Sequence, residues 1–396
     1  MVPFFIFISL WSFAQEEIID KKEILLLNRA IEILATEGVN QMYNFDFVRA
    51  EQRFQYLKQL YPEHPLAYFL MGLGYWWRIM VNTDNQEYDD IFLAYMDSSL
   101  TFAHRLYNQN KNNPEASFFL SAAYGFKGRL YAERKQWTKA ALAGNNALAY
   151  LKHGKQYSDL SPEFKFGDAL YNYYSVWIPK NYPSLRPLML FFKKGNKELG
   201  LQLLHEVANN SFYTRTEAQY FLMRIYHVEE EMPEKALPIA EYLSRTFPNN
   251  PFFQRYYAAM CFSQSQFAEA ERVARHILEK IETGTRYYEE VSGRYACYIL
   301  AYIYRYQKND RANAKLYYTR AMNYAEQIKA YDSGYYHSSL MSLARIAKEE
   351  KDFETAKQFY EKAKKYVEKK GNYRKEIDDF LKEYKKNAKN AKKVRK

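Results

Sequence analysis

Two consecutive blocks of 34 residues decide how this sequence folds: EAQYFLMRIYHVEEEMPEKALPIAEYLSRTFPNN (Glu217–Asn250) and PFFQRYYAAMCFSQSQFAEAERVARHILEKIETG (Pro251–Gly284). Each block predicts a helix, a short turn and a second helix. Counted from its own first residue, each block has Ala at positions 20 and 24 and an aliphatic residue at position 27. A small residue at a fixed position lets two helices approach closely, so the repeat indicates stacked helical hairpins.

This spacing resembles that of the tetratricopeptide repeat (TPR) family, and it recurs along most of the chain. It is clearest in five blocks: Ile31–His64, Ser121–Gly154, Glu217–Asn250, Pro251–Gly284 and His337–Lys370. The chain departs from the family pattern at Arg224, which stands at position 8 of its block, where the family has Gly. The family's Trp at position 4 is also missing. The resemblance implies an all-α fold, a right-handed α-solenoid of about eight TPR-like helical hairpins with a C-terminal capping helix.

The pattern divides the chain into successive parts. Residues 1–14 are predicted to be a signal peptide, 15–154 N-terminal hairpins, 155–216 an irregular helical segment, 217–370 C-terminal repeats, and 371–396 a capping helix and a basic tail. The middle segment is set apart because Pro179, Pro183 and Pro187 interrupt its helices. A helix restarts near Gly195, and Gly200 takes the small-residue position 20.

The first residues have the pattern of a secretory signal. Val2–Phe13 is an apolar run, and Ser12-Phe13-Ala14 places small residues at −3 and −1 of a cleavage before Gln15. The run is shorter than the ~20 apolar residues that span a bilayer. A retained anchor and a misassigned start are the alternatives. The ending resembles export signals of Bacteroidota, which implies an exported protein that is periplasmic or associated with the outer membrane.

Charge and cysteine usage say little about the solenoid itself. The net charge is +11, and residues 385–396 alone hold seven cations and no acid. This tail is either solvated or in peripheral contact with an anionic membrane or the cell wall, and no nucleic acid is expected as a partner. Cys261 and Cys297 are predicted to be buried free thiols, with a disulfide as the alternative.

Motifs that would carry chemistry are missing from the sequence. The seven histidines have no zinc-binding spacing, and there is neither a nucleophile elbow nor a phosphate-binding glycine loop. The run Glu229–Glu231 is interpreted as a solvated turn. We therefore expect no enzyme, no metal and no cofactor. The remaining alternative is an active site within residues 155–215, where four aromatic residues cluster: Tyr171, Tyr173, Tyr174 and Trp177.

The TPR resemblance implies a binding groove on the concave side. In peptide-binding members of the family, positions 2, 5, 9, 12 and 13 of each first helix line this groove. Aromatic side chains there would hold an apolar anchor, and guanidinium groups would clamp a carboxylate. The predicted partner-binding residues are Phe69, Trp76, Trp77, Arg129, Phe252, Arg255, Arg345 and Lys348. The alternatives are that the aromatic residues belong to the solenoid core and the cations to a solvated face.

The sequence thus predicts a non-enzymatic scaffold of the bacterial cell envelope that holds a protein or peptide partner in a TPR groove. The alternative is a structural envelope protein that contacts membrane or peptidoglycan through its basic tail.

Overall fold

The computed structural model describes residues 24–190 and 192–394, and in this part of the chain every regular element is a helix. The predicted signal peptide lies outside the described residues. Paired helices follow one another along the chain: α1 (Arg29–Tyr43) with α2 (Phe47–Leu60), α3 (Pro65–Ile79) with α4 (Asp89–Gln109), α5 (Pro114–Glu133) with α6 (Trp137–Gly154), α7 (Phe166–Asn181) with α9 (Lys197–Asn210), α10 (Arg215–Arg224) with α11 (Pro233–Thr246), α12 (Pro251–Ser263) with α13 (Phe267–Glu282), α14 (Glu290–Tyr306) with α15 (Arg311–Gln327), and α16 (Gly334–Glu349) with α17 (Phe353–Lys364). A last helix, α18 (Asn372–Val394), follows the pairs. The predicted fold class, an all-α solenoid of helical hairpins with a C-terminal helix, is confirmed.

The tight turns inside the hairpins share one construction. The chain leaves the first helix through a residue in the left-handed region, such as Phe45 (φ 62°) or Lys351 (φ 61°). The next residue, Asp46 or Asp352, caps the second helix, because its carboxylate accepts a hydrogen bond from a backbone N–H three residues later at 3.3 or 3.1 Å. These caps satisfy free N–H groups at the start of α2 and α17. The turns before α6 and α13 are equally short, although Gln136 and Gln266 form no side-chain cap there.

Residues 155–216 also build a hairpin, although it is interrupted. Helix α7 ends at Asn181, the short helix α8 (Arg186–Met189) follows, and α9 then packs against α7. At Gly200 an added Cβ would lie 2.7 Å from the backbone nitrogen of Tyr173 and 2.8 Å from the carbonyl oxygen of Ala169. Only glycine fits where the two backbones approach this closely. Gly200 therefore has the role that position 20 of the repeat predicts.

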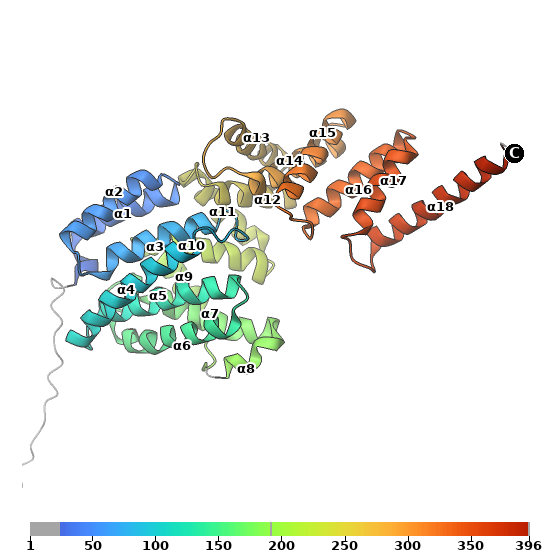
Figure 1. The fold of residues 1–396 in the computed structure, drawn as a ribbon. Coiled ribbons are helices and arrows are strands. Elements are labelled where there is room, and N and C mark those ends of the chain that lie inside the picture. Colours follow the sequence, from blue (N-terminus) through green and yellow to red (C-terminus); the bar gives the residue numbers. More distant parts are fainter. Residues whose placement is uncertain (1–23, 191, 395–396) are drawn as a thin grey trace, which may run out of the picture.

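The first six hairpins curve until their inner faces meet, and this part of the solenoid (α1–α13) is called the closed turn below (Figure 1). Asn250 Nδ2 donates to the carbonyl oxygen of Tyr43 at 2.8 Å, and Trp77 Nε1 donates to Glu217 Oε1 at 2.8 Å. One continuous apolar core accordingly runs from Ile24 to Ala321. Residues more than 130 positions apart in sequence thus share a core, as the 140-residue separation of Trp77 and Glu217 illustrates.

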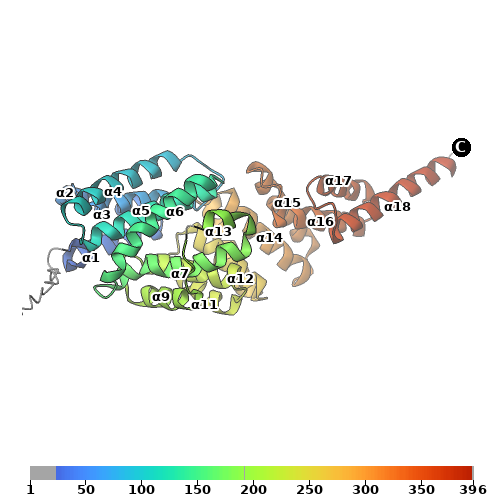
Figure 2. The same ribbon diagram turned by 90° about the horizontal axis from the view of Figure 1, so that it is seen from below.

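The remaining helices, α14–α18, project from the closed turn and are called the arm (Figures 1 and 2). The arm has a second core, which extends from Ala301 on α14 to Phe380 on α18. Within the described residues, no helix is both long enough and apolar enough to cross a membrane.

Candidate partner-binding surfaces

Six of the eight predicted partner-binding residues gather on the inner side of the closed turn. Trp77 of α3 lies 6.0 Å from the ring of Phe252 on α12, measured between ring centroids. The guanidinium carbon of Arg129 lies 4.5 Å from the Trp76 ring centroid. Arg255 NH2 donates to the carbonyl oxygen of Met80, directly after α3, at 3.1 Å. Six residues predicted from the groove positions therefore share one face: Phe69, Trp76, Trp77, Arg129, Phe252 and Arg255.

This shared face is covered by the protein itself. Trp76 and Trp77 have no exposed surface, and Phe69 and Arg255 are also buried. The prediction that the two tryptophans hold a partner's apolar anchor is wrong for this structure, because α10 and α12 already pack on that side of α3. The alternative, that these aromatic residues belong to the core, accounts for their burial. Phe252 and Arg129 remain partly exposed.

Polar groups are enclosed with these aromatic residues. Glu217 is buried and accepts from Trp77 Nε1, while Arg129 NH2 donates to the hydroxyl of Tyr220 at 2.7 Å. Burial raises the pKa of Glu217, although the charge of Arg129 and the hydrogen bond from Trp77 oppose that rise. A buried carboxylate is costly unless it is hydrogen-bonded, so this pairing specifies how the two ends of the closed turn meet.

The other two predicted residues, Arg345 and Lys348, lie on α16 and face α18. Arg345 forms a bidentate pair with Glu376, with Nε–Oε1 at 2.9 Å and NH2–Oε2 at 2.6 Å. Hydrogen bonds from Arg345 and Tyr360 lower the pKa of Glu376. The guanidinium predicted to clamp a partner's carboxylate is thus already paired within the chain.

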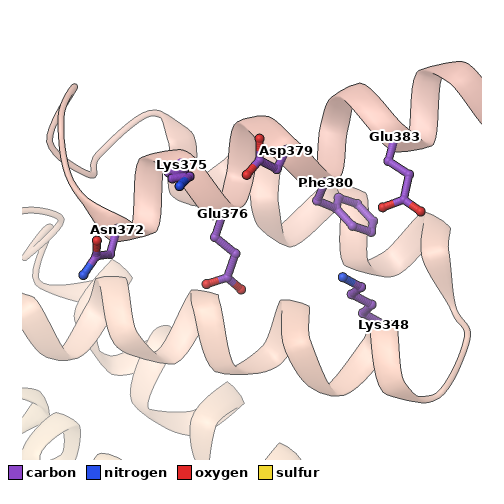
Figure 3. A pocket seen from close by; sticks show the side chains of 7 residues that line it. All are labelled: Lys348, Asn372, Lys375, Glu376, Asp379, Phe380 and Glu383. Carbon is purple, nitrogen blue, oxygen red and sulfur yellow. The ribbon is translucent and has the colours of Figure 1, made fainter.

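Lys348, by contrast, is exposed and lines a hollow of about 360 Å³ between α16 and α18. Figure 3 shows its amine below the ring of Phe380, with Glu376 and Glu383 on either side. Residues of both charges line the hollow: Lys348, Asn372, Lys375, Glu376, Asp379, Phe380 and Glu383. The alternative that the cations belong to a solvated face therefore fits Lys348, which is exposed, better than Arg345, which is paired with Glu376.

A row of aromatic residues on the arm was not predicted from the sequence. The turn between α14 and α15 has four residues, Gln307–Asp310, whereas the turn between α12 and α13 has three, Gln264–Gln266. The extra residue shifts the register of α14 by one position. Its groove positions 2, 5, 9, 12 and 13 then become Tyr295, Tyr298, Tyr302, Arg305 and Tyr306.

The shifted register agrees with burial. It places Cys297, Leu300 and Ala301 at the interior positions 4, 7 and 8, and all three have no exposed surface. The sequence contained a usable signal, because tyrosines at 295, 298, 302 and 306 follow the three- and four-residue spacing of one helix face.

These tyrosines form a continuous aromatic row with residues of the neighbouring first helices, here called the tyrosine face: Phe262, Tyr295, Tyr298, Tyr302, Tyr306 and Tyr335. Ring centroids lie 4.5 Å apart for Tyr298 and Tyr335, 4.9 Å for Phe262 and Tyr302, and 4.6 Å for Tyr302 and Tyr306. Tyr306 is 53% exposed, and the other members are half-buried. The face therefore offers ring edges and hydroxyl groups to solvent while its backbone is fixed by the helices.

Charged groups border the tyrosine face at one end. Arg305 NH2 lies 2.5 Å from Glu349 Oε1, and Arg311 NH2 lies 3.2 Å from Glu349 Oε2. Burial raises the pKa of Tyr298, so its phenol is neutral at physiological pH and can donate a hydrogen bond. The face thus combines neutral donors, aromatic surface and a net positive edge.

The acidic run Glu229–Glu231, which was expected to be a solvated turn, is partly buried against neighbouring helices. The run begins at the last residue of a π-helical turn, Ile225–Glu229, which follows α10 directly. The side chain of Glu229 is 1% exposed and accepts from the Tyr174 hydroxyl at 3.0 Å. Glu230 accepts from Lys197 Nζ at 2.7 Å. The expectation of a solvated turn is wrong for Glu229 and Glu230, because these two carboxylates join α10 to the α7–α9 hairpin, whereas Glu231 is exposed as expected.

The two cysteines agree more closely with the prediction from sequence. Cys261 and Cys297 are free and have no exposed surface, as predicted. Burial raises their pKa values, to about 11 for Cys261 and about 12 for Cys297. Over the residues that the structure describes, no cluster of three or more His, Cys, Asp or Glu side chains has the geometry to hold a metal ion.

Comparisons with known proteins add little to this geometry. No protein-family model and no curated protein matches the sequence. Among solved structures, the human IFIT1 dimer with PPP-AAAA is 13% identical, with a TM-score of 0.42, and the match covers 81% of this chain and 68% of that chain. The TPR domain of P58(IPK) is 11% identical, with a TM-score of 0.22, and the match covers 90% of this chain and 98% of that chain. The paired helices themselves define the class, a TPR-like α-solenoid.

Proposed function

We propose that this protein is a non-enzymatic scaffold that binds a protein partner, as an extended peptide, along the tyrosine face of the arm. The observation that carries the proposal is the half-buried aromatic row on α14, which lies at the groove positions of the repeat and is extended by Phe262 of α12 and Tyr335 of α16. The corresponding face of the closed turn is largely buried, so the arm offers the more accessible inner surface.

The binding energy would come from apolar and aromatic side chains of the peptide that cover the tyrosine rings. Tyrosine suits this role because it combines a large ring with a hydroxyl donor and has few rotatable bonds. Arg305 and Lys348 would orient acidic groups of the peptide, with smaller contributions because both side chains are partly solvated or already paired.

The test is partner capture by cross-linking in cells, comparing the wild-type chain with the double variant Tyr302→Ala/Tyr306→Ala. The control is Tyr56→Ala, which removes a similarly exposed tyrosine (51%) from α2 of the closed turn. The proposal expects a defined partner that the control retains and the double variant loses at unchanged helix content. Equal capture by all three proteins would contradict a role for the tyrosine face.

The proposal also includes the cellular location of the protein. Residues 2–14 have the composition of an export signal, which supports a scaffold of the bacterial envelope in the periplasm or at the outer membrane. Fractionation of cells that express the tagged chain tests this location. Recovery of the intact, uncleaved chain with the cytoplasmic fraction would contradict it.

The second candidate function is structural attachment to a membrane or to peptidoglycan through the basic tail. It is favoured by the exposed Lys382, Lys385 and Lys386 on the projecting end of α18. Deletion of residues 385–396 should release the protein from the envelope under this function. Under the leading proposal the same deletion should leave peptide capture unchanged.

A further inference from the structure

Two arginine side chains are buried at the junction between the closed turn and the arm without an acidic partner. Arg255 on α12 is 8% exposed, and Arg294 on α14 is 9% exposed. Arg255 donates only to neutral groups, to Ser292 Oγ at 3.4 Å and to the carbonyl oxygen of Met80 at 3.1 Å. Among the described residues Arg294 finds no hydrogen-bond acceptor, and its Nε is fully enclosed.

The two guanidinium groups share one location. The acceptor of Arg255, Ser292, lies in the first turn of α14, two residues before Arg294. The guanidinium carbon of Arg294 lies 5.3 Å from the ring centroid of the adjacent Tyr295. Burial lowers the pKa of Arg255 to about 10, and the positive charge of Arg294 contributes to that decrease. The positive charge of Arg294 therefore acts on the buried guanidinium of Arg255.

Buried arginines elsewhere in the described chain have acidic partners. Arg78 lies 2.6 Å from Glu51, and Arg134 lies 2.6 Å from Asp89, although both guanidinium side chains are only 8% exposed. At the junction the acidic residue that acts on Arg255 is Glu289, which is exposed and too far away for an ion pair. An enclosed pair of like charges is strongly unfavourable unless a counter-charge arrives from outside.

We infer that Arg255 and Arg294 form a binding site for a doubly charged, tetrahedral oxyanion, either free phosphate or a phosphate ester. Two guanidinium groups carry two positive charges, so one dianion neutralises the pair, whereas one carboxylate leaves half of the charge uncompensated. Planar guanidinium groups match the oxygen edge of phosphate and can each donate two hydrogen bonds. The phenol ring of Tyr295 forms an adjacent wall. The anion site does not depend on the proposed peptide, although it borders the tyrosine face at their shared residue Tyr295.

The test uses the full chain and titrates inorganic phosphate, glycerol phosphate, sulfate and acetate, with binding followed by calorimetry and thermal melting. The variant is Arg294→Met, which removes the charge but keeps an apolar stem of similar length. The matched control is Arg286→Met, which removes an exposed arginine eight residues earlier. Phosphate is expected to raise the melting temperature of the wild type and of the control. Arg294→Met should weaken phosphate binding by about tenfold or more, since hydrogen bonds to a charged group are lost.

A merely structural arginine would behave differently in the absence of anion. Because Arg294 lacks an acidic partner, Arg294→Met without added anion should melt at the wild-type temperature or a few degrees higher. A lower melting temperature for that variant would overturn the inference. Sulfate keeps both charges across neutral pH, so its binding should not strengthen from pH 6 to pH 8, whereas phosphate binding should.

The remaining outcomes are equally decisive. Glycerol phosphate binding as tightly as phosphate would identify an ester as an accepted source, and binding of inorganic phosphate alone would restrict the site to the free anion. Acetate binding as strong as phosphate binding would refute the preference for a doubly charged anion. Phosphate binding by Arg294→Met equal to that of the wild type would refute the assignment of the site to Arg294. Tyr302→Ala/Tyr306→Ala should bind phosphate normally, which separates failure of this site from failure of the tyrosine face.

Discussion

Replacement of Trp77 by alanine should separate the two ends of the closed turn. The Trp77 side chain is fully buried, and its ring lies 5.2 Å from Tyr43 and 5.1 Å from Phe253, on helices far apart in sequence. Truncation of a fully buried tryptophan costs about 3–5 kcal/mol. Loss of its indole N–H also leaves buried Glu217 without that donor, which adds about 1–3 kcal/mol. The expected loss is thus about 4–8 kcal/mol of unfolding free energy.

The assay is urea unfolding followed by far-ultraviolet circular dichroism, with small-angle scattering of the native state. Trp77→Phe should lie between the alanine variant and the wild type, because it keeps a ring but loses the N–H donor. Trp137→Ala is the control, since Trp137 is 45% exposed and its loss should cost less than about 1 kcal/mol. If Trp77→Ala costs no more than Trp137→Ala, the argument that Trp77 joins the two ends is refuted.

Three further predictions follow from single features. Gly200→Ala should destabilise the protein by about 1–3 kcal/mol in chemical unfolding, because the new methyl group meets backbone atoms of α7, whereas Gly334→Ala, with nothing within 4 Å, should not; equal stabilities would refute the close approach. Glu217 has a raised pKa in the folded state, so its contribution to stability is fully present below the unfolded value of about 4.3 and is lost as pH rises through the folded value. Glu217→Gln lacks this loss, and its stability relative to wild type should increase from pH 4 to pH 7; a constant difference across that range would argue against the raised pKa. Cys261 and Cys297 should react with a thiol reagent only after unfolding, and rapid reaction in native buffer would contradict their burial.

The hairpins were predictable from sequence because their determinants are local. Small residues at position 20, such as Ala236 and Ala270, fix where paired helices meet, and these spacings lie within 34 residues. Burial of the cysteines was also predictable, because each lies among aromatic residues on the first helix of a hairpin.

Closure of the solenoid was not predictable in this way. It depends on the curvature accumulated over several hairpins, which brings Trp77 to Glu217 without any local signal in either segment. The groove positions therefore placed Trp76 and Trp77 on the correct face of the solenoid. The prediction that a partner can reach them was wrong, because both are fully buried. The tyrosine face was missed for a smaller reason, the single extra residue in the turn before Arg311.

The central claim is that the first six hairpins close on themselves and leave the arm as the accessible inner surface. It is tested most directly by an engineered disulfide between positions 44 and 249, in a background with Cys261 and Cys297 replaced by serine. The backbone N–H of Asn249 donates to Asn44 Oδ1 at 3.1 Å, across 205 residues of sequence. The account predicts that Asn44→Cys/Asn249→Cys oxidises readily in the native protein to a cross-linked monomer, whereas Asn44→Cys paired with Asp332→Cys on the arm does not. A native Asn44→Cys/Asn249→Cys protein that stays reduced, or that cross-links no faster than the control pair, would contradict closure.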